Sequence, residues 1–365
     1  MTLSTKKRII FIDMMRAFAV LMMVQGHTID VFLSDSFRNT DSFIFFLWNM
    51  NRGLTAPIFM FSSGVVFTYL LRLNRMPFYF NPRVKKGLRR FVLLVLIGYL
   101  LRYPTFTVLD FSLVTKAQWY SFFTVDALHL IGFGLLFILC LAFIAEKFNI
   151  SDYAVFSFGA LLFFTLFLFT ENISWINYLP LPFSAYLYHG TGSLFPFFPW
   201  AGYVISGAVL GCYLARNPNS FASKNFSVRL FVFGISFIAL SQIVELLELY
   251  ILHRDYIWTD NIHVIFWRMG WVVLLNSFMS YLALKLKNIP DLVKQVGKHT
   301  LLVYAVHVII LYGSAWVPGL NLIFSRNMDI YSSIVAAIVM IFSMLLMVIG
   351  LEKYKLHRKN KLATA

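Results

Sequence analysis

An arginine and a histidine lie eleven residues apart in one long apolar stretch near the amino terminus, at Arg16 and His27. In an α-helix this separation amounts to about three turns plus 20°, so both side chains would project from one face, about 16 Å apart along the axis. A guanidinium group binds phosphates well, and an imidazole can act as a general base near neutral pH. The spacing therefore suggests a site with a phosphate-binding end and a proton-accepting end.

A structural interpretation competes with this one. Asp13 lies three residues before Arg16, within reach for an ion pair on one helix. The two could form a purely structural pair, and His27 could be an interfacial histidine bonded to a loop. Spacing by itself somewhat favours the structural interpretation. In the functional interpretation, Asp13 and Arg16 fix the helix below a catalytic His27.

Polar residues inside other apolar stretches are further candidates. Ionisable groups at membrane depth cost roughly 2.5–3.5 kcal/mol on insertion scales, so they usually face a partner or a watery cavity. Packing does not explain an arginine in the middle of an apolar stretch, so Arg52 is a candidate functional cation. Composition alone favours a packing role for Ser62, Ser63 and Gly64. The other candidates are Asp126 (also a plausible helix N-cap), His129, Glu245, Glu248, Arg268, Tyr304 and His307.

The composition is that of an integral membrane protein. Of the 365 residues, 59% are hydrophobic and only 13% are charged, whereas a soluble domain is about a quarter charged. Apolar stretches long enough to span a bilayer recur from end to end, which predicts an all-α polytopic protein with one membrane domain over residues 1–365. We expect ten spans, at about 9–31, 43–71, 91–111, 125–145, 153–170, 197–215, 228–250, 263–284, 299–317 and 330–351.

The distribution of positive charge predicts the orientation. In a soluble protein, a net charge of +15 would suggest nucleic acid, but membrane proteins collect Lys and Arg in their cytoplasmic loops. Of the 31 Lys and Arg residues, 23 fall on one side of the ten spans and 4 on the other. The loop Arg72–Arg90 is the richest. Both termini are therefore predicted to be cytoplasmic, with no nucleic-acid partner.

Three further features complete the pattern. Cys140 and Cys212 both lie in apolar stretches, which predicts small buried side chains and no disulfide. The spacing of Cys and His residues does not resemble a zinc ligand set, so no metal is expected. The long extracytoplasmic connection Glu171–Phe195 either covers an outward-facing site or simply joins two spans.

Several segments together resemble the transmembrane acyltransferases. The opening R-x-x-F-I-D-x-x-R-A contains Arg8, Asp13 and Arg16, and the interval from Arg16 to His27 fits the R-x10-H signature of acyltransferase-3 enzymes. The segments G-L-T-A-P-I-F-M-F-S-S-G (53–64), D-A-L-H-L-I-G (126–132), S-L-F-P-F-F-P-W-A-G…G (193–207) and V-G-K-H-T-L-L-V-Y-A-V-H (296–307) are similar to family motifs. The chain most resembles the heparan-α-glucosaminide N-acetyltransferase-like branch (the domain of unknown function 1624 group), related to acyltransferase-3.

The resemblance implies helices around a tunnel, with acyl-CoA, usually acetyl-CoA, entering from the cytoplasm as co-substrate. The acceptor would be a sugar, glycan or glycolipid on the extracytoplasmic side of a plasma membrane. Membrane lipids surround such a protein, and a second copy of the chain is a further candidate partner. His27 would be the catalytic base, with His307 as the second choice and Asp13 in support. Candidate residues for binding acyl-CoA are Arg16, Arg52, Ser63 and Arg268.

Two departures from the family pattern leave alternatives open. Ala17 stands where many members have Gly, and some members of the N-acetyltransferase branch use a histidine further along the chain.

The main functional alternative is a transporter or flippase of glycolipids or small metabolites, because buried charges and interrupted helices also suit transport.

Overall fold

The computed structural model describes residues 9–250, 261–286 and 288–363, and in this part of the chain it is built from helices without strands. Helices account for 78% of the structure, which confirms an all-α polytopic membrane protein. Five of the positive positions used to predict orientation lie outside the described residues, namely Lys6, Lys7, Arg8, Arg254 and Lys287.

Within the described residues, eight helices are long and apolar enough to cross a membrane. They correspond to eight of the ten predicted spans. They are α1 (Ile10–Phe32), α2 (Phe43–Arg72), α5 (Ala127–Lys147), α6 (Asp152–Thr170), α8 (Phe197–Arg216), α9 (Lys224–Tyr250), α10 (Ile262–Lys285) and α14 (Ile330–Ala363, apolar enough over Ile330–Lys361).

The other two predicted spans contain helices with different bounds. In place of 91–111, α3 covers Pro82–Leu101, because Asn81 caps its first turn and Pro82 takes the first helical position. Its opening turns carry the basic residues, and the helix stops before Pro104, since a residue preceding proline disfavours helix. In place of 299–317, α12 covers only Thr300–Tyr312, because Gly313 follows it at a φ of 78°.

The described residues form two compact units. The central unit comprises Pro57–Leu284, and the terminal unit comprises Ile9–Ala56 together with Lys285–Ala365. Helix α2 passes from one to the other at Pro57, a residue without an N–H to continue the helical hydrogen bonding.

The central unit has a tightly packed set of helices around α8. Helix α8 packs against α5 and α6, and α3 packs against α5. Asp126 caps α5 by accepting hydrogen bonds from the N–H groups of Leu128 and His129, as its sequence position predicted. Shorter helices in this unit are α4 (Lys116–Phe123) and α7 (Leu181–Ser184).

Glycines allow α2 and α8 to approach backbone to backbone. A Cβ atom on Gly64 of α2 would overlap the Val204 carbonyl, and one on Gly207 of α8 would overlap the Phe61 carbonyl. Close packing of small residues is a common basis of helix association in membranes. The packing interpretation of Gly64 is therefore the one the structure shows. At one end of the same helices, Arg72 and Arg216 each donate to Asp152 at 2.6 Å.

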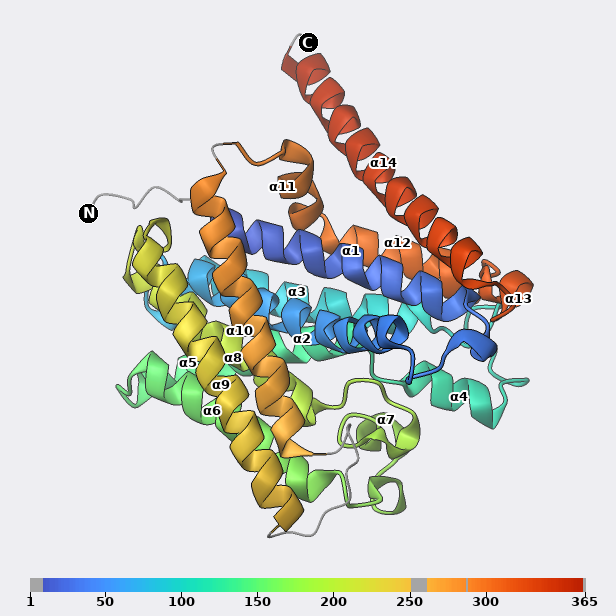
Figure 1. Cartoon of the computed structure of the whole chain (residues 1–365), viewed down its shortest axis with the longest axis horizontal. Helices are drawn as coiled ribbons and strands as arrows, with labels where there is room; N and C mark the ends of the chain where they lie inside the picture. Colours follow the sequence, from blue (N-terminus) through green and yellow to red (C-terminus); the bar gives the residue numbers. More distant parts are fainter. Residues whose placement is uncertain (1–8, 251–260, 287, 364–365) are drawn as a thin grey trace. The chain divides into compact units, whose positions relative to one another are not determined.

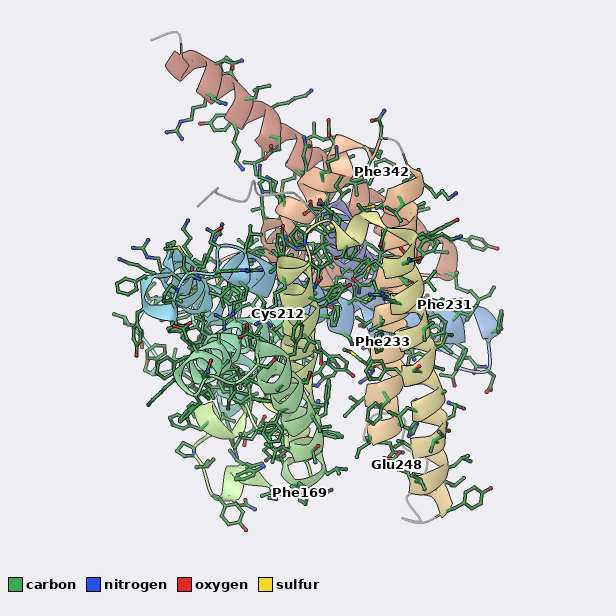
Figure 2. All side chains as sticks on the ribbon, turned by 90° about the vertical axis from the view of Figure 1, so that its left-hand side faces the viewer. Phe169, Cys212, Phe231, Phe233, Glu248 and Phe342 are labelled. Atoms are coloured by element: carbon green, nitrogen blue, oxygen red, sulfur yellow. The ribbon has the colours of Figure 1, made fainter. Side chains whose placement is uncertain are left out.

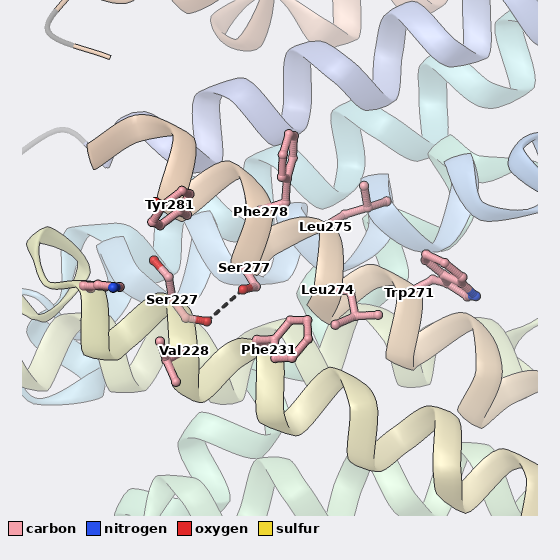
Figure 3. Close-up of a pocket in the computed structure, with 10 residues that line it drawn as sticks. Ser227, Val228, Phe231, Trp271, Leu274, Leu275, Ser277, Phe278 and Tyr281 are labelled. Carbon is pink, nitrogen blue, oxygen red and sulfur yellow. Dashed lines mark hydrogen bonds between the residues drawn. The ribbon is translucent and has the colours of Figure 1, made fainter. Parts of the chain in front are cut away.

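Helices α9 and α10 present apolar surface. Phe231 and Phe233 of α9 are 54% and 61% exposed (Figure 2), as expected for side chains that face lipid. A groove of about 490 Å³ lies between the two helices (Figure 3). A hydrogen bond joins the two helices beside the groove, where Ser277 Oγ donates to the Ser227 carbonyl at 2.7 Å. The groove is apolar, and no predicted site residue lines it.

The terminal unit is organised around α1. Helix α1 packs against α11 (Asp291–Lys298), α12 and α14, and the short α13 (Asn321–Phe324) lies at its carboxyl end. Aliphatic side chains and methionines fill the contact between these helices. They include Ala17, Val20 and Val24 of α1, Val303 and Leu311 of α12, and Met340, Met344 and Val348 of α14.

Candidate active site

Arg16 and His27 both contact α12. Arg16 Nη2 donates to Thr300 Oγ1 at 2.8 Å, and His27 Nδ1 lies 3.0 Å from His307 Nε2. The later residue of α1 contacts the later residue of α12, so the two helices run parallel (Figure 1). Thr300 and His307 are seven residues apart, about two turns, and therefore share one face of α12. Arg16 and His27 thus project toward the same neighbouring helix, as their spacing predicted.

The histidine pair is enclosed by aromatic rings. The His27 and His307 rings stack with centroids 5.2 Å apart and an interplanar angle of 22°. The Tyr312 and His27 rings make a T-shaped contact with their centroids 5.9 Å apart, and the Tyr304 and His307 rings make another at 5.6 Å. His307 is completely buried (0% exposed), whereas His27 keeps some exposed surface. Of the two imidazoles, only His27 is placed to meet a reactant from outside the helix packing.

A second charged cluster lies at the His27 end of α1. Asp30, three residues beyond His27, accepts a hydrogen bond from Arg52 and another from Arg38 Nη1 at 3.0 Å. The aliphatic part of Arg52 also lies close to Gly26. Arg52 is therefore beside the histidine pair, more than two turns of α1 away from Arg16. Arg38 also pairs with Asp35 at 3.3 Å, so the two arginines of the cluster face two carboxylates.

Asp13 belongs to the first turn of α1, three residues from Arg16. Helix α11 reaches the backbone here, since a Cβ on Gly297 would overlap the Asp13 carbonyl. This close contact positions the amino-terminal end of α1 against the segment that leads into α12. Asp13 is separated from His27 by about four helical turns, so any part it has in catalysis is through the position of α1.

Ser63 and Arg268, the other predicted acyl-CoA contacts, belong to the central unit. The Ser63 hydroxyl donates to the Phe59 carbonyl at 2.8 Å within α2. Arg268 of α10 lies over the Trp200 ring, with its guanidinium carbon 5.3 Å from the centroid. Among the residues that the structure describes, no three His, Cys, Asp or Glu side chains gather in a way that could hold a metal ion.

One polar network in the structure was not predicted from the sequence. Trp200 Nε1 donates to His189 Nε2 at 3.4 Å, and His189 Nδ1 lies 3.1 Å from Glu171. Together with Arg268 over the Trp200 ring, this forms a chain of charged and aromatic groups in the central unit. The available signal was the long polar connection Glu171–Phe195, which contains both Glu171 and His189.

Comparison with known families decides the class of the protein. Residues 9–352 match the acyltransferase domain of the acyltransferase-3 family. The chain belongs to this family. The match contains both members of each α1–α12 contact and all the segments quoted above except Arg8. This acyltransferase-3 protein is thus a membrane acyltransferase built from apolar helices. No curated protein shows a significant match to the chain.

Proposed function

We propose that the protein transfers an acyl group from acyl-CoA in the cytoplasm to a sugar, glycan or glycolipid on the extracytoplasmic side of the membrane. The observation that carries the proposal is the double contact of α1 with α12. It places a cation and an imidazole pair along the same helix–helix contact in an acyltransferase-3 chain. The acyl group would be acetyl. Within the superfamily we place the chain in the heparan-α-glucosaminide N-acetyltransferase-like branch.

Each residue of the terminal unit has a distinct role in this proposal. Arg16 would hold phosphate groups of the co-substrate near the cytoplasmic end of α1. His27 would accept the proton of the acceptor hydroxyl or amine. Arg52 lies beside His27, so its charge suits the oxyanion that forms when the thioester carbonyl is attacked. Ser63 and Arg268 remain candidate acyl-CoA contacts from the central unit.

The membrane location follows the same reasoning. The protein would be a multi-pass component of the plasma (inner) membrane with both termini in the cytoplasm, because the basic segments then face inward. The basic carboxyl-terminal part of α14, which contains Lys353, Lys355 and Arg358, would extend into the cytoplasm. Acyl-CoA would be the only cofactor, used as a co-substrate without a metal.

Mass spectrometry of surface glycans tests the proposal directly. Cells with the gene should carry acetylated surface glycans or glycolipids that cells without it lack, and the purified protein should bind acetyl-CoA and release free CoA. Failure to bind or consume any acyl-CoA, together with movement of a glycolipid across proteoliposomes, would establish the transporter alternative and overturn the proposal.

Replacing Arg16 by alanine is expected to weaken acetyl-CoA binding by about 10–100-fold, because a charge-assisted hydrogen bond contributes roughly 1.5–3 kcal/mol. Titration of the purified protein with acetyl-CoA measures the change. Analogues that lack phosphate groups make the measurement specific, since Arg16→Ala should matter little for a donor without them.

Two variants separate the charge of Arg16 from its structural contact. Thr300→Val removes the hydrogen bond to Arg16 and leaves the guanidinium in place, so acetyl-CoA affinity should change by less than about threefold if the charge is what binds phosphate. Arg326→Ala removes a surface charge that pairs with Asp35 and should have no effect. Equal losses in Arg16→Ala and Thr300→Val would assign Arg16 to packing.

A further inference from the structure

The hydrogen bonds of the histidine pair have a direction. His307 Nδ1 lies 2.8 Å from the carbonyl oxygen of Val303, one turn earlier in α12. A carbonyl oxygen can only accept, so Nδ1 of His307 must carry a hydrogen. In a neutral imidazole the other nitrogen then holds a lone pair. Nε2 of His307 is therefore an acceptor.

The next bond follows from this one. His27 Nδ1 and His307 Nε2 are 3.0 Å apart, and one hydrogen must lie between them. Because Nε2 of His307 accepts, His27 Nδ1 donates. Nε2 of a neutral His27 is then left with its lone pair, and among the described residues this nitrogen has no hydrogen-bond partner. The chain Val303–His307–His27 thus ends in an available proton acceptor.

We propose that His307 is a positioning residue that holds His27 in the tautomer whose Nε2 is the catalytic base. The tautomer of a histidine is set by the hydrogen bond that its other nitrogen makes, and here Nδ1 of His27 is bound to His307. His307 itself is excluded as the base because both of its nitrogens are engaged and its side chain is completely buried. This inference rests on the proposed acyl transfer and assigns the base within it.

The proton path is balanced by this arrangement. As the acceptor oxygen or nitrogen attacks the thioester carbonyl carbon, its proton moves to Nε2 of His27, and the carbon–sulfur bond breaks. The thiolate of CoA then takes that proton from Nε2, so the products are the acylated acceptor and free CoA. Throughout, Nδ1 of His27 keeps its hydrogen and donates to His307, which stabilises the transient imidazolium. The Val303 carbonyl cannot take up a proton, so the chain ends there.

Nitrogen-15 NMR of histidine-labelled protein in lipid bilayers tests the tautomers without any assay of activity. We expect both His27 and His307 to carry hydrogen on Nδ1 and none on Nε2, with a nitrogen–nitrogen coupling between His27 Nδ1 and His307 Nε2. Spectra of His27→Gln and His307→Leu assign the two signals. His357→Gln, at an exposed position of α14, should remove one signal and leave the pair unchanged.

Kinetics of two variants test the positioning role. His307→Gln keeps an acceptor oxygen at about the reach of Nε2, so kcat should stay within about tenfold of the parent protein. His307→Leu offers no acceptor, and kcat should fall by on the order of 10²-fold or more, within the range of general-base catalysis. The KM for acetyl-CoA should be unchanged in both, and the Nδ1–H signal of His27 should be lost only in His307→Leu.

The outcomes separate this inference from the proposed function. Hydrogen on Nε2 of His27 in the parent protein overturns the inference even if acyl transfer is found. Equal kinetic losses in the Gln and Leu variants reduce His307 to a packing residue. Absence of any acyl transfer, with the expected NMR pattern present, overturns the proposed function and leaves a histidine pair whose order is purely structural.

Discussion

Replacing His27 by alanine is expected to lower the rate of acyl transfer by about 10²–10⁴-fold, the usual contribution of a general base. The methyl group cannot accept the proton of the acceptor. The neighbouring His307 does not take over, because its ring is completely buried and lies behind the position of the His27 ring. Release of free CoA by membranes that contain the variant, with a fixed acceptor, measures the loss. Binding of acetyl-CoA should stay within about threefold of the parent protein, because phosphate contacts are separate from the base.

The control for this change is a histidine outside the pair. His357→Ala alters an exposed residue of α14 and should retain full activity at an equal amount of protein in the membrane. Because His27 is only partly buried, the alanine variant should also fold. A His27→Ala protein that transfers acetyl groups at the parent rate would remove His27 from the mechanism.

The membrane helices were largely predictable because a span depends on a local run of apolar residues. The two differences at α3 and α12 have local causes that hydropathy averages conceal. Asn81 and Pro82 start α3 inside a basic segment, and Gly313 ends α12 after thirteen residues. Capping and positive φ angles therefore decide where a helix begins and ends, even where apolar sequence continues on one side.

The site was predictable only in part. The face shared by Arg16 and His27 follows from the helical repeat alone, whereas the partner of each depends on packing between segments about 280 residues apart. Arg52 shows the limit most clearly. Its position inside an apolar stretch of sequence identified it as functional or paired, but only the fold places it with Asp30, at the end of α1 opposite to Arg16.

Two of the segments that resemble the family meet each other in the central unit. The segment 53–64 ends at Gly64, and the segment 193–207 ends at Gly207. In the structure these glycines lie in the same contact between α2 and α8, each against a carbonyl of the opposite helix. At least part of that resemblance thus concerns helix packing, and a motif can identify a family through residues that never touch a substrate.

Replacing Gly64 by alanine is expected to cost at least about 1–3 kcal/mol of stability, the usual penalty of overpacking. The added methyl group would overlap the Val204 carbonyl, and a backbone carbonyl in a helix cannot turn aside as a flexible side chain can. Helices α2 and α8 must therefore separate. Gly207→Ala should have the same effect through the Phe61 carbonyl. Size-exclusion profiles and melting temperatures in detergent should show less folded protein and a lower melting temperature for both variants.

Gly53 provides the matched control because it belongs to the same helix and has nothing within 4 Å of the position a Cβ would take. Gly53→Ala should leave stability unchanged or raise it by up to about 1 kcal/mol, since alanine costs less backbone entropy than glycine in a helix. If all three variants have the same melting temperature, helix propensity and not the α2–α8 contact governs the change in stability. A double variant sharpens the distinction: Gly64→Ala and Gly207→Ala act on one contact, so their combined cost should be smaller than the sum of the separate costs.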